Sequence, residues 1–301
     1  MHVAAEDFAD VLKTPAQISP LAARSLLQSV ARAGGRLVAV GQRGHILVSS
    51  DGGRTWKQSD VPVSSDLTSV FFADESEGWA AGHDGVILHT SDGGSTWALQ
   101  LSGVDGGDKP FLDLWFSDSR NGYAVGAYNL VYRTSDGGKT WESVSDRTDN
   151  PKSMNLYAIR PAGGALMVAG EGGLALRLDP ASRRFKAVTL PYNGSFFGVA
   201  DAGSTAILFG LRGHAFASSD GARTWKQVDT GLAASIVAAA RADDGRLLLA
   251  DAAGRIASTR DGHAFAPVVL EQPTPVAGLA DAGNGNLVLV GPRGATVAAA
   301  R

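Results

Sequence analysis

One eight-residue motif occurs four times in this chain, and no other feature restricts the fold as strongly. The copies read SSDGGRTW (49–56), TSDGGSTW (90–97), TSDGGKTW (134–141) and SSDGARTW (218–225). Weaker copies place Asp179 and Asp261 at the matching position, so an aspartate recurs roughly every 41 to 44 residues between Asp51 and Asp261. A period of about 40 to 45 residues in a chain of short strands is the signature of a β-propeller blade.

A second marker, a glycine-rich turn, follows the same period and gives the number of repeats. It begins at Gly41, Gly82, Gly126, Gly170, Gly210, Asp251 and Gly291, which predicts seven blades. In the second repeat, four runs rich in branched and aromatic residues (67–72, 78–82, 86–91 and 96–100) alternate with short Asp, Gly and Ser turns. This is the pattern of four antiparallel strands.

We therefore predict a single all-β domain over residues 1–301, a seven-bladed β-propeller of four-stranded antiparallel blades. The approximate blades are 26–60, 66–101, 111–145, 154–190, 195–229, 235–270 and 275–301. The last blade supplies only three strands. We expect residues 10–18, which resemble 56–63, to close the ring as its N-terminal strand, because this would hide two unpaired sheet edges.

Composition excludes several classes of partner. The net charge of −3 has no basic run behind it, so we expect no nucleic-acid partner. No apolar stretch approaches the roughly 18 residues of a membrane span, so the chain is not expected to cross a membrane. The absence of cysteine rules out disulfides and thiolate metal sites.

The repeated motif itself is predicted to be structural. Its aspartate can accept hydrogen bonds from turn amides, the glycine can adopt a conformation that other residues avoid, and the tryptophan can pack between blades. The residues given this role are Ser49, Asp51, Gly53, Thr55, Trp56, Thr90, Asp92, Gly94, Thr96, Trp97, Thr134, Asp136, Gly138, Thr140, Trp141, Ser218, Asp220, Thr224 and Trp225, with Ala222 standing where glycine is expected.

These residues match the Asp-box (BNR repeat) of sialidases and related propellers. The longer patterns SVFFADESEGWAAGHDGVILHTSDGGSTW (69–97) and DLWFSDSRNGYAVGAYNLVYRTSDGGKTW (113–141) resemble the photosystem II stability/assembly factor family, over nearly the whole chain. The resemblance implies a seven-bladed propeller of the thylakoid lumen or periplasm that helps to assemble membrane complexes. The Ala-, Arg- and Gly-rich composition is closer to a non-photosynthetic bacterial relative.

From this resemblance we expect a non-enzymatic scaffold or accessory factor that docks onto a membrane protein complex from the periplasmic side. A transporter is one candidate client. The periplasmic location rests on the family and on an Ala-rich start that looks like a trimmed export product. We expect no cofactor and no metal, because the six histidines are scattered and the acidic stretches 105–108 and 145–150 do not fit a calcium loop.

A carbohydrate-active propeller, either glycosidase- or sialidase-like or glycan-binding, is the alternative. A sialidase would need an arginine cluster and a tyrosine nucleophile, and the chain lacks the Arg-Ile-Pro segment typical of sialidases. The chain also lacks the Gly-x-Ser-x-Gly elbow of a serine nucleophile. A glycosidase would need two facing carboxylates, for which Asp66, Asp105, Asp108 and Glu171 are available on loops. Their spacing selects no pair.

The remaining candidate is a surface. In a propeller, the turns between second and third strands share one face with the links between blades. This turn face should carry Arg43, His83, Asp84, Tyr128, Asn129, Glu171, Arg212 and Arg293. Arg43, Arg212 and Arg293 recur at equivalent positions and could bind acidic groups of a partner. The resemblance implies the same, because photosynthetic members of the family carry an arginine-rich patch. The alternative is that they are solvated turn residues. His45 and His214 also recur, which indicates inheritance of the repeat more than a metal site.

Overall fold

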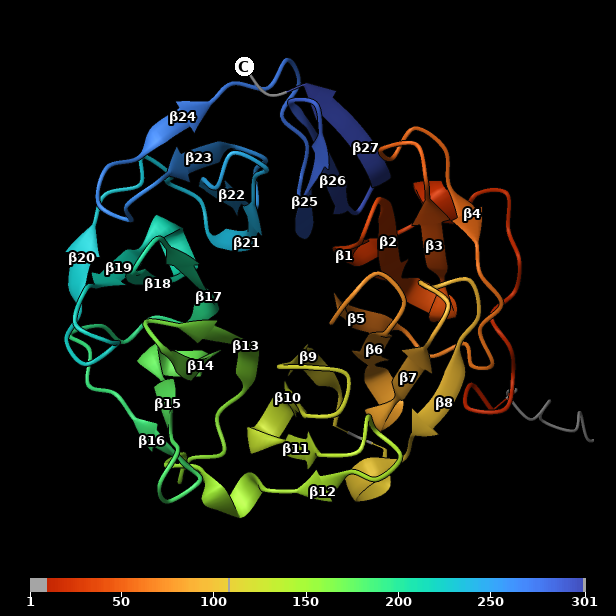
Figure 1. Ribbon diagram of the computed structural model, residues 1–301, viewed down its shortest axis with the longest axis horizontal. Coiled ribbons are helices and arrows are strands. Elements are labelled where there is room, and N and C mark those ends of the chain that lie inside the picture. Colours follow the sequence, from red (N-terminus) through yellow and green to blue (C-terminus); the bar gives the residue numbers. More distant parts are fainter. Residues whose placement is uncertain (1–9, 108, 300–301) are drawn as a thin grey trace, which may run out of the picture.

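The computed structural model describes residues 10–107 and 109–299 and shows a ring of seven β-sheets around a central axis (Figure 1). This confirms the predicted seven-bladed propeller. Consecutive strands are hydrogen-bonded neighbours in antiparallel order, running from the axis to the rim.

Blades one to three contain β1 (Leu27–Ala33), β2 (Arg36–Gly41), β3 (Ile46–Ser49), β4 (Lys57–Gln58), β5 (Leu67–Phe72), β6 (Gly78–Gly82), β7 (Ile87–Thr90), β8 (Ala98–Leu101), β9 (Phe111–Phe116), β10 (Gly122–Gly126), β11 (Val131–Thr134) and β12 (Glu142–Ser143). Blades four to seven contain β13 (Leu156–Ala162), β14 (Ala165–Gly170), β15 (Ala175–Asp179), β16 (Arg184–Ala187), β17 (Phe196–Ala202), β18 (Thr205–Gly210), β19 (Ala215–Ser218), β20 (Lys226–Val228), β21 (Ile236–Arg241), β22 (Leu247–Asp251), β23 (Ile256–Thr259), β24 (Ala266–Val268), β25 (Gly278–Gly283), β26 (Asn286–Gly291) and β27 (Gly294–Ala299). The short 3₁₀ turns are η1 (Ala22–Arg24), η2 (Gln42–Gly44), η3 (His83–Gly85), η4 (Val104–Gly106), η5 (Ala127–Asn129), η6 (Ser145–Arg147), η7 (Glu171–Gly173) and η8 (Leu211–Gly213).

The core lies between neighbouring blades. The second strands are buried almost throughout, as in β6 and β18, because a blade is covered on both faces by its neighbours. Between blades two and three, the rings of Trp79 and Phe116 stack with centroids 3.6 Å apart. The outer strands are the most exposed of each blade, which explains their polar sequences.

Ring closure differs from the prediction. Residues 10–18 form no strand; instead, the Ala16 N–H donates to Val61 O (3.0 Å) and the Ser64 N–H to Val11 O (2.9 Å). Ala16 is buried in the apolar cluster between blades one and two, which explains why this segment follows the rim of blade one. The expected closing strand is therefore wrong, and among the described residues blade seven has three strands.

Apolar packing between blades one and seven closes the ring instead. Leu27 and Leu37 of blade one share a buried cluster with Val288 and Val290 of blade seven. The 3₁₀ turn η1 also lies against the start of β27, where Gly294 leaves no room for a side chain beside Ala23 O. The first and last blades are thus joined without a shared sheet.

Candidate functional site

The turns between second and third strands are held rigidly by the links between blades. The first residue of the turn donates its N–H to the carbonyl of the link residue just before the first strand of the same blade. The Gln42 N–H donates to Leu26 O (3.1 Å) and the His83 N–H donates to Asp66 O (2.8 Å). The same bond recurs from Leu211 to Ser195 O (2.9 Å). In blades one to six the turn face is therefore a fixed surface, because each of these turns is tied to a link; in blade seven the first turn residue is Pro292, which has no N–H to donate.

A polar side chain in the next link also caps four of these turns. Asp66 Oδ1 accepts the Arg43 N–H (2.7 Å), and Asn155 Oδ1 accepts the Tyr128 N–H (2.9 Å). Ser195 and Ser235 cap the turns of blades four and five in the same way. Arg43, Asp84, Tyr128 and Arg212 have positive φ at the centre of their turns, a conformation that residues other than glycine rarely adopt.

The predicted surface residues lie on this turn face. Arg43, His83, Tyr128, Arg212 and Arg293 are exposed, and Tyr128 keeps 62% of its surface accessible. Glu171 is half-buried because its carboxylate accepts the Asn155 N–H at 3.1 Å. Glu171 therefore helps to hold the turn of blade four. Asp84 and Asn129 are also only partly exposed, and the Asn129 amide bonds Ser145 O and the side chains of Thr148 and Asn150.

The three arginines do not form one patch. Arg43 and Arg293 belong to blades one and seven, which are neighbours, whereas Arg212 belongs to blade five and blade six lies between blades five and seven (Figure 1). Within the described residues none of the three guanidinium groups forms an ion pair. Arg293 sits in a shorter turn, since Gly291 pairs directly with Gly294.

The opposite face carries the Asp-box turns, whose hydrogen bonds explain the motif. Asp51 Oδ1 accepts the main-chain N–H groups of Arg54 (3.0 Å) and Thr55 (2.9 Å), while Oδ2 accepts the Thr55 hydroxyl (2.6 Å). The Ser49 hydroxyl accepts the Gly53 N–H at 2.8 Å. Asp92, Asp136 and Asp220 accept the equivalent threonine bonds in their turns, and Asp179 and Asp261 accept main-chain N–H groups in the weaker copies.

These bonds favour the charged carboxylates. The Thr55 hydroxyl, then the Thr55 amide, lowers the pKa of Asp51 to about 2, and the equivalent Thr140 bonds lower the pKa of Asp136 to about 2. For Asp92, partial burial opposes the shift, but the Thr96 bonds outweigh it and its pKa is lowered. The motif carboxylates are therefore occupied as acceptors within their own turns.

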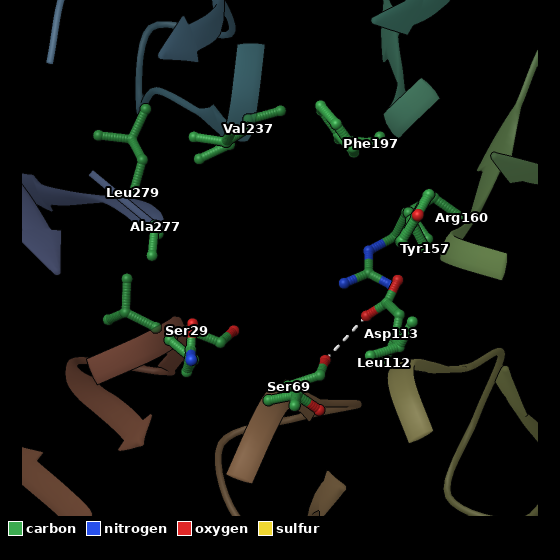
Figure 2. A pocket seen from close by; sticks show the side chains of 18 of the residues that line it. Ser29, Ser69, Leu112, Asp113, Tyr157, Arg160, Phe197, Val237, Ala277 and Leu279 are labelled. Carbon is green, nitrogen blue, oxygen red and sulfur yellow. Dashed lines mark hydrogen bonds and ion pairs between the residues drawn. The ribbon is translucent and has the colours of Figure 1, made fainter. Parts of the chain in front are cut away.

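A β-bulge near the start of the first strand recurs in six blades and was not anticipated from the sequence. The register skips one residue, so that the skipped side chain turns toward the ring axis. The skipped residues are Gln28, Thr68, Leu112, Tyr157, Phe197 and Val237. All six line an axial cavity of about 270 Å³ (Figure 2).

An ion pair bridges three blades in the wall of this cavity. Asp113 of β9 is 5% exposed and accepts hydrogen bonds from Ser69 Oγ (2.8 Å), the Ile159 N–H (2.8 Å) and Arg160 Nη1 (2.6 Å) (Figure 2). Arg160 Nη1 also donates to Leu114 O at 3.0 Å, and its guanidinium lies 5.9 Å from the centre of the Phe71 ring. The pair ties blades two, three and four together at the axis.

The two histidines at equivalent positions, His45 and His214, each lie against a neighbouring side chain. His45 is buried and its Nδ1 lies 3.1 Å from Ser25 Oγ; burial, then Arg43, lowers its pKa. The ring of His214 lies 4.8 Å from that of Tyr192, tilted by 41°, and Tyr192 belongs to the link before blade five. The described residues contain no cluster of three His, Asp or Glu side chains that could hold a metal ion.

Of the carboxylates considered for glycoside hydrolysis, Asp66 and Glu171 are engaged with the main chain. Asp66 and Glu171 each accept a main-chain N–H on the turn face, Asp66 from the turn of blade one and Glu171 from the link before blade four. Asp105 lies in η4 of a link, and Asp108 lies outside the described residues. In residues 10–107 and 109–299, no helix has the length and apolar character needed to cross a bilayer.

The fold and the repeated turn define a class, the seven-bladed Asp-box β-propellers. The family model "Photosynthesis system II assembly factor YCF48" matches residues 30–108 and 104–264, so the chain belongs to this family, as its resemblance indicated. No curated protein matches the chain.

Solved structures agree on the fold. The chain is similar to YCF48 bound to a D1 peptide (17% identity, TM-score 0.72, covering 93% of this chain and 94% of that one). It is also similar to YCF48 from Cyanidioschyzon merolae, with 17% identity and a TM-score of 0.68, covering 93% of this chain and 97% of that one. A third similar structure is the WD40 β-propeller domain of Doa1, with 12% identity and a TM-score of 0.68, covering 95% of each chain. At these identities the likeness shows the architecture alone.

Proposed function

We propose that this protein is a non-enzymatic assembly or accessory factor that docks onto a membrane protein complex from the periplasmic side through its turn face. The observation that carries the proposal is the pair of exposed arginines, Arg43 and Arg293, on adjacent blades. Both lie on turns of a rigid ring, and neither has an ion-pair partner among the described residues. Guanidinium groups held in this way suit bidentate recognition of acidic side chains.

Family membership supports a protein partner, because a related propeller is described as bound to a D1 peptide. The Asp-box carboxylates support a non-enzymatic role, since each is engaged in its own turn. A transporter is one membrane complex that would fit, and capture from the native host identifies the client.

The test compares two charge reversals on opposite faces. The turn-face variant carries Arg43→Glu, Arg212→Glu and Arg293→Glu. The control carries Arg54→Glu, Lys139→Glu and Arg223→Glu on the Asp-box turns, where the three side chains are also exposed and the change in net charge is the same. Each tagged protein is expressed in the native host, and the complexes captured from solubilised membranes are compared by mass spectrometry.

We expect the wild type and the control to capture the same membrane protein, and the turn-face variant to lose most of that capture and its salt dependence. Equal capture by all three proteins would contradict docking through the arginines. Recovery of the captured client from cytoplasmic fractions only would contradict the periplasmic location. Hydrolysis of glycosides by the wild type in a substrate panel would contradict the non-enzymatic assignment.

A further inference from the structure

Blade seven has an open sheet edge at the rim of the ring. In blades one to six a fourth strand covers the third, but β27 is the outermost strand of its sheet in the described structure (Figure 1). The first residue of each third strand normally bonds this fourth strand: the Ser59 N–H donates to Ile46 O (2.9 Å) and the Val144 N–H to Val131 O (2.9 Å). Ala295 is the corresponding residue in blade seven, and within residues 10–107 and 109–299 no strand lies beyond it.

The ladder geometry shows which main-chain groups face outward. The Ala277 N–H donates to Val290 O at 2.8 Å, so the main chain of Val290 faces β25. Ala295 pairs with Val290, and in an antiparallel ladder it must then direct its own N–H and C=O away from β26. Val297 and Ala299 follow with the same orientation. Hydrogen bonds among the described residues leave these outward groups without a partner.

The edge also lacks the features that protect most of the other outer strands. Charged residues stand in four of the six, at Lys57 in β4, Glu142 in β12, Arg184 in β16 and Lys226 in β20, and β24 contains Pro267; β8, with the sequence ALQL, has neither. Charges and proline discourage pairing with another strand. The sequence of β27, GATVAA, contains neither, and Val297 keeps 38% of its surface exposed.

The described part of the chain forms no strand along this edge, although η1 lies beside Gly294 at the start of β27. Residues 10–19 are bound to blade one, through Ala16 to Val61 and through Ser19 to Gln58, and they lead away from blade seven toward the link after blade one. A second copy pairing through the same edge would join two convex rims along a few residues. Such a contact is far smaller than the roughly 1,200 Å² of a stable interface.

We propose that β27 accepts an extended peptide segment of a partner protein as the fourth strand of blade seven, antiparallel to β27. The outward N–H and C=O groups of Ala295, Val297 and Ala299 supply the main-chain bonds. A cavity of about 330 Å³ between Pro273, Thr274 and the side chains of Thr296 and Ala298 receives a side chain of the added strand. Arg293 stands where the added strand ends, so an acidic residue is favoured there.

This inference rests on the proposed function only in taking the occupant to be a partner protein, and its test does not need that partner. The probe is a synthetic peptide with the sequence of residues 55–61, TWKQSDV, which contains the outer strand of blade one. In blade one this strand runs antiparallel to β3 and is followed by Asp60, so in blade seven that aspartate would lie near Arg293. A peptide with proline in place of the residue equivalent to Ser59 serves as the control, because the Ser59 N–H is the one that bonds Ile46 O in blade one.

The readout is amide hydrogen exchange at Val297 and Ala299, measured by NMR on the full-length protein. In the free protein we expect fast exchange at both amides, and saturating peptide should slow it about tenfold or more. Val297→Pro removes one outward N–H without removing a bond to β26 and should abolish the effect. Val297→Ala keeps the N–H and loses side-chain contacts, so it should still bind the peptide.

Four results would overturn the proposal. Protection of Val297 and Ala299 in the free monomer would mean that the chain covers its own edge. Protection that rises with protein concentration, together with dimers in sedimentation, would assign the edge to a second copy. Absence of any effect at millimolar peptide, or equal binding of the proline control peptide, would remove the edge as a strand acceptor. The peptide control remains decisive if Val297→Pro does not fold.

Discussion

Removing the carboxylate of Asp113 should destabilise the ring more than an ordinary surface mutation. Asp113→Ala deletes three hydrogen bonds at once, from Ser69, Ile159 and Arg160, at a site that is 5% exposed. An unpaired buried N–H such as that of Ile159 costs about 1–3 kcal/mol. Breaking a fully buried ion pair costs about 3–5 kcal/mol, but the Arg160 side chain is 33% exposed and water can solvate part of its charge. We therefore expect a loss of about 3 kcal/mol in the free energy of unfolding.

The partner mutation separates the ion pair from the other bonds. Arg160→Met removes the charge that Asp113 faces, and in the double variant neither charge is left unpaired. We expect the double variant to be more stable than the sum of the single losses implies, by about 1–3 kcal/mol. Urea unfolding of the four proteins, followed by both circular dichroism and tryptophan fluorescence, measures this coupling and tests whether the transition is two-state. A loss below about 0.5 kcal/mol for Asp113→Ala, or strict additivity, would refute the account of the axial ion pair.

Two further perturbations test the turns on each face. Gly82→Ala should lower the free energy of unfolding by about 3 kcal/mol, because the new Cβ would lie 2.1 Å from Asp66 O. Gly35→Ala is the control and should be nearly neutral, because a Cβ at Gly35 meets nothing within 4 Å. Equal unfolding midpoints for the two variants would contradict the steric argument. Acid unfolding tests the Asp-box carboxylates: the folded pKa of Asp136 is lowered from 3.8 to about 2, so its contribution to stability is present above about pH 4 and is lost as the pH falls toward 2. Asp136→Asn should therefore flatten the pH dependence of the unfolding midpoint between pH 4 and 2, and an unchanged slope would show that the turn bonds do not stabilise the charged form.

The repeat predicted the ring, the turns and the aspartates that accept the hydrogen bonds of the Asp-box turns. An Asp-box and a glycine turn mark the two ends of a third strand, and both can be read from the sequence. The axial cavity could not be predicted in the same way. A bulge redirects Tyr157 or Phe197 by one register step, and hydrophobic alternation alone does not reveal which residue is skipped. The position of the bulge is nevertheless regular: in all six blades the skipped residue is the second residue of the first strand.

Closure was missed for a related reason. Residues 10–18 resemble an outer strand, but a resemblance does not specify which sheet edge the segment meets. Ala16 finds a buried position against Val61 of blade one, and that local burial decides the outcome. The ion pair between Asp113 and Arg160 also could not be predicted from the sequence, because two charges in different blades are brought together only by the curvature of the ring.

The central claim is that this propeller works as a docking platform through one face, and photocrosslinking from two ends of one strand tests it most directly. Tyr128 and Lys139 both belong to blade three, at the turn before β11 and at the Asp-box turn after it, and both are exposed. A photoreactive amino acid is placed at either position in the native host, and the crosslinked products are identified by mass spectrometry. We predict crosslinks to a membrane protein from position 128 and none from position 139. Crosslinks to a membrane protein from position 139 alone, or from neither position, would contradict docking through the turn face.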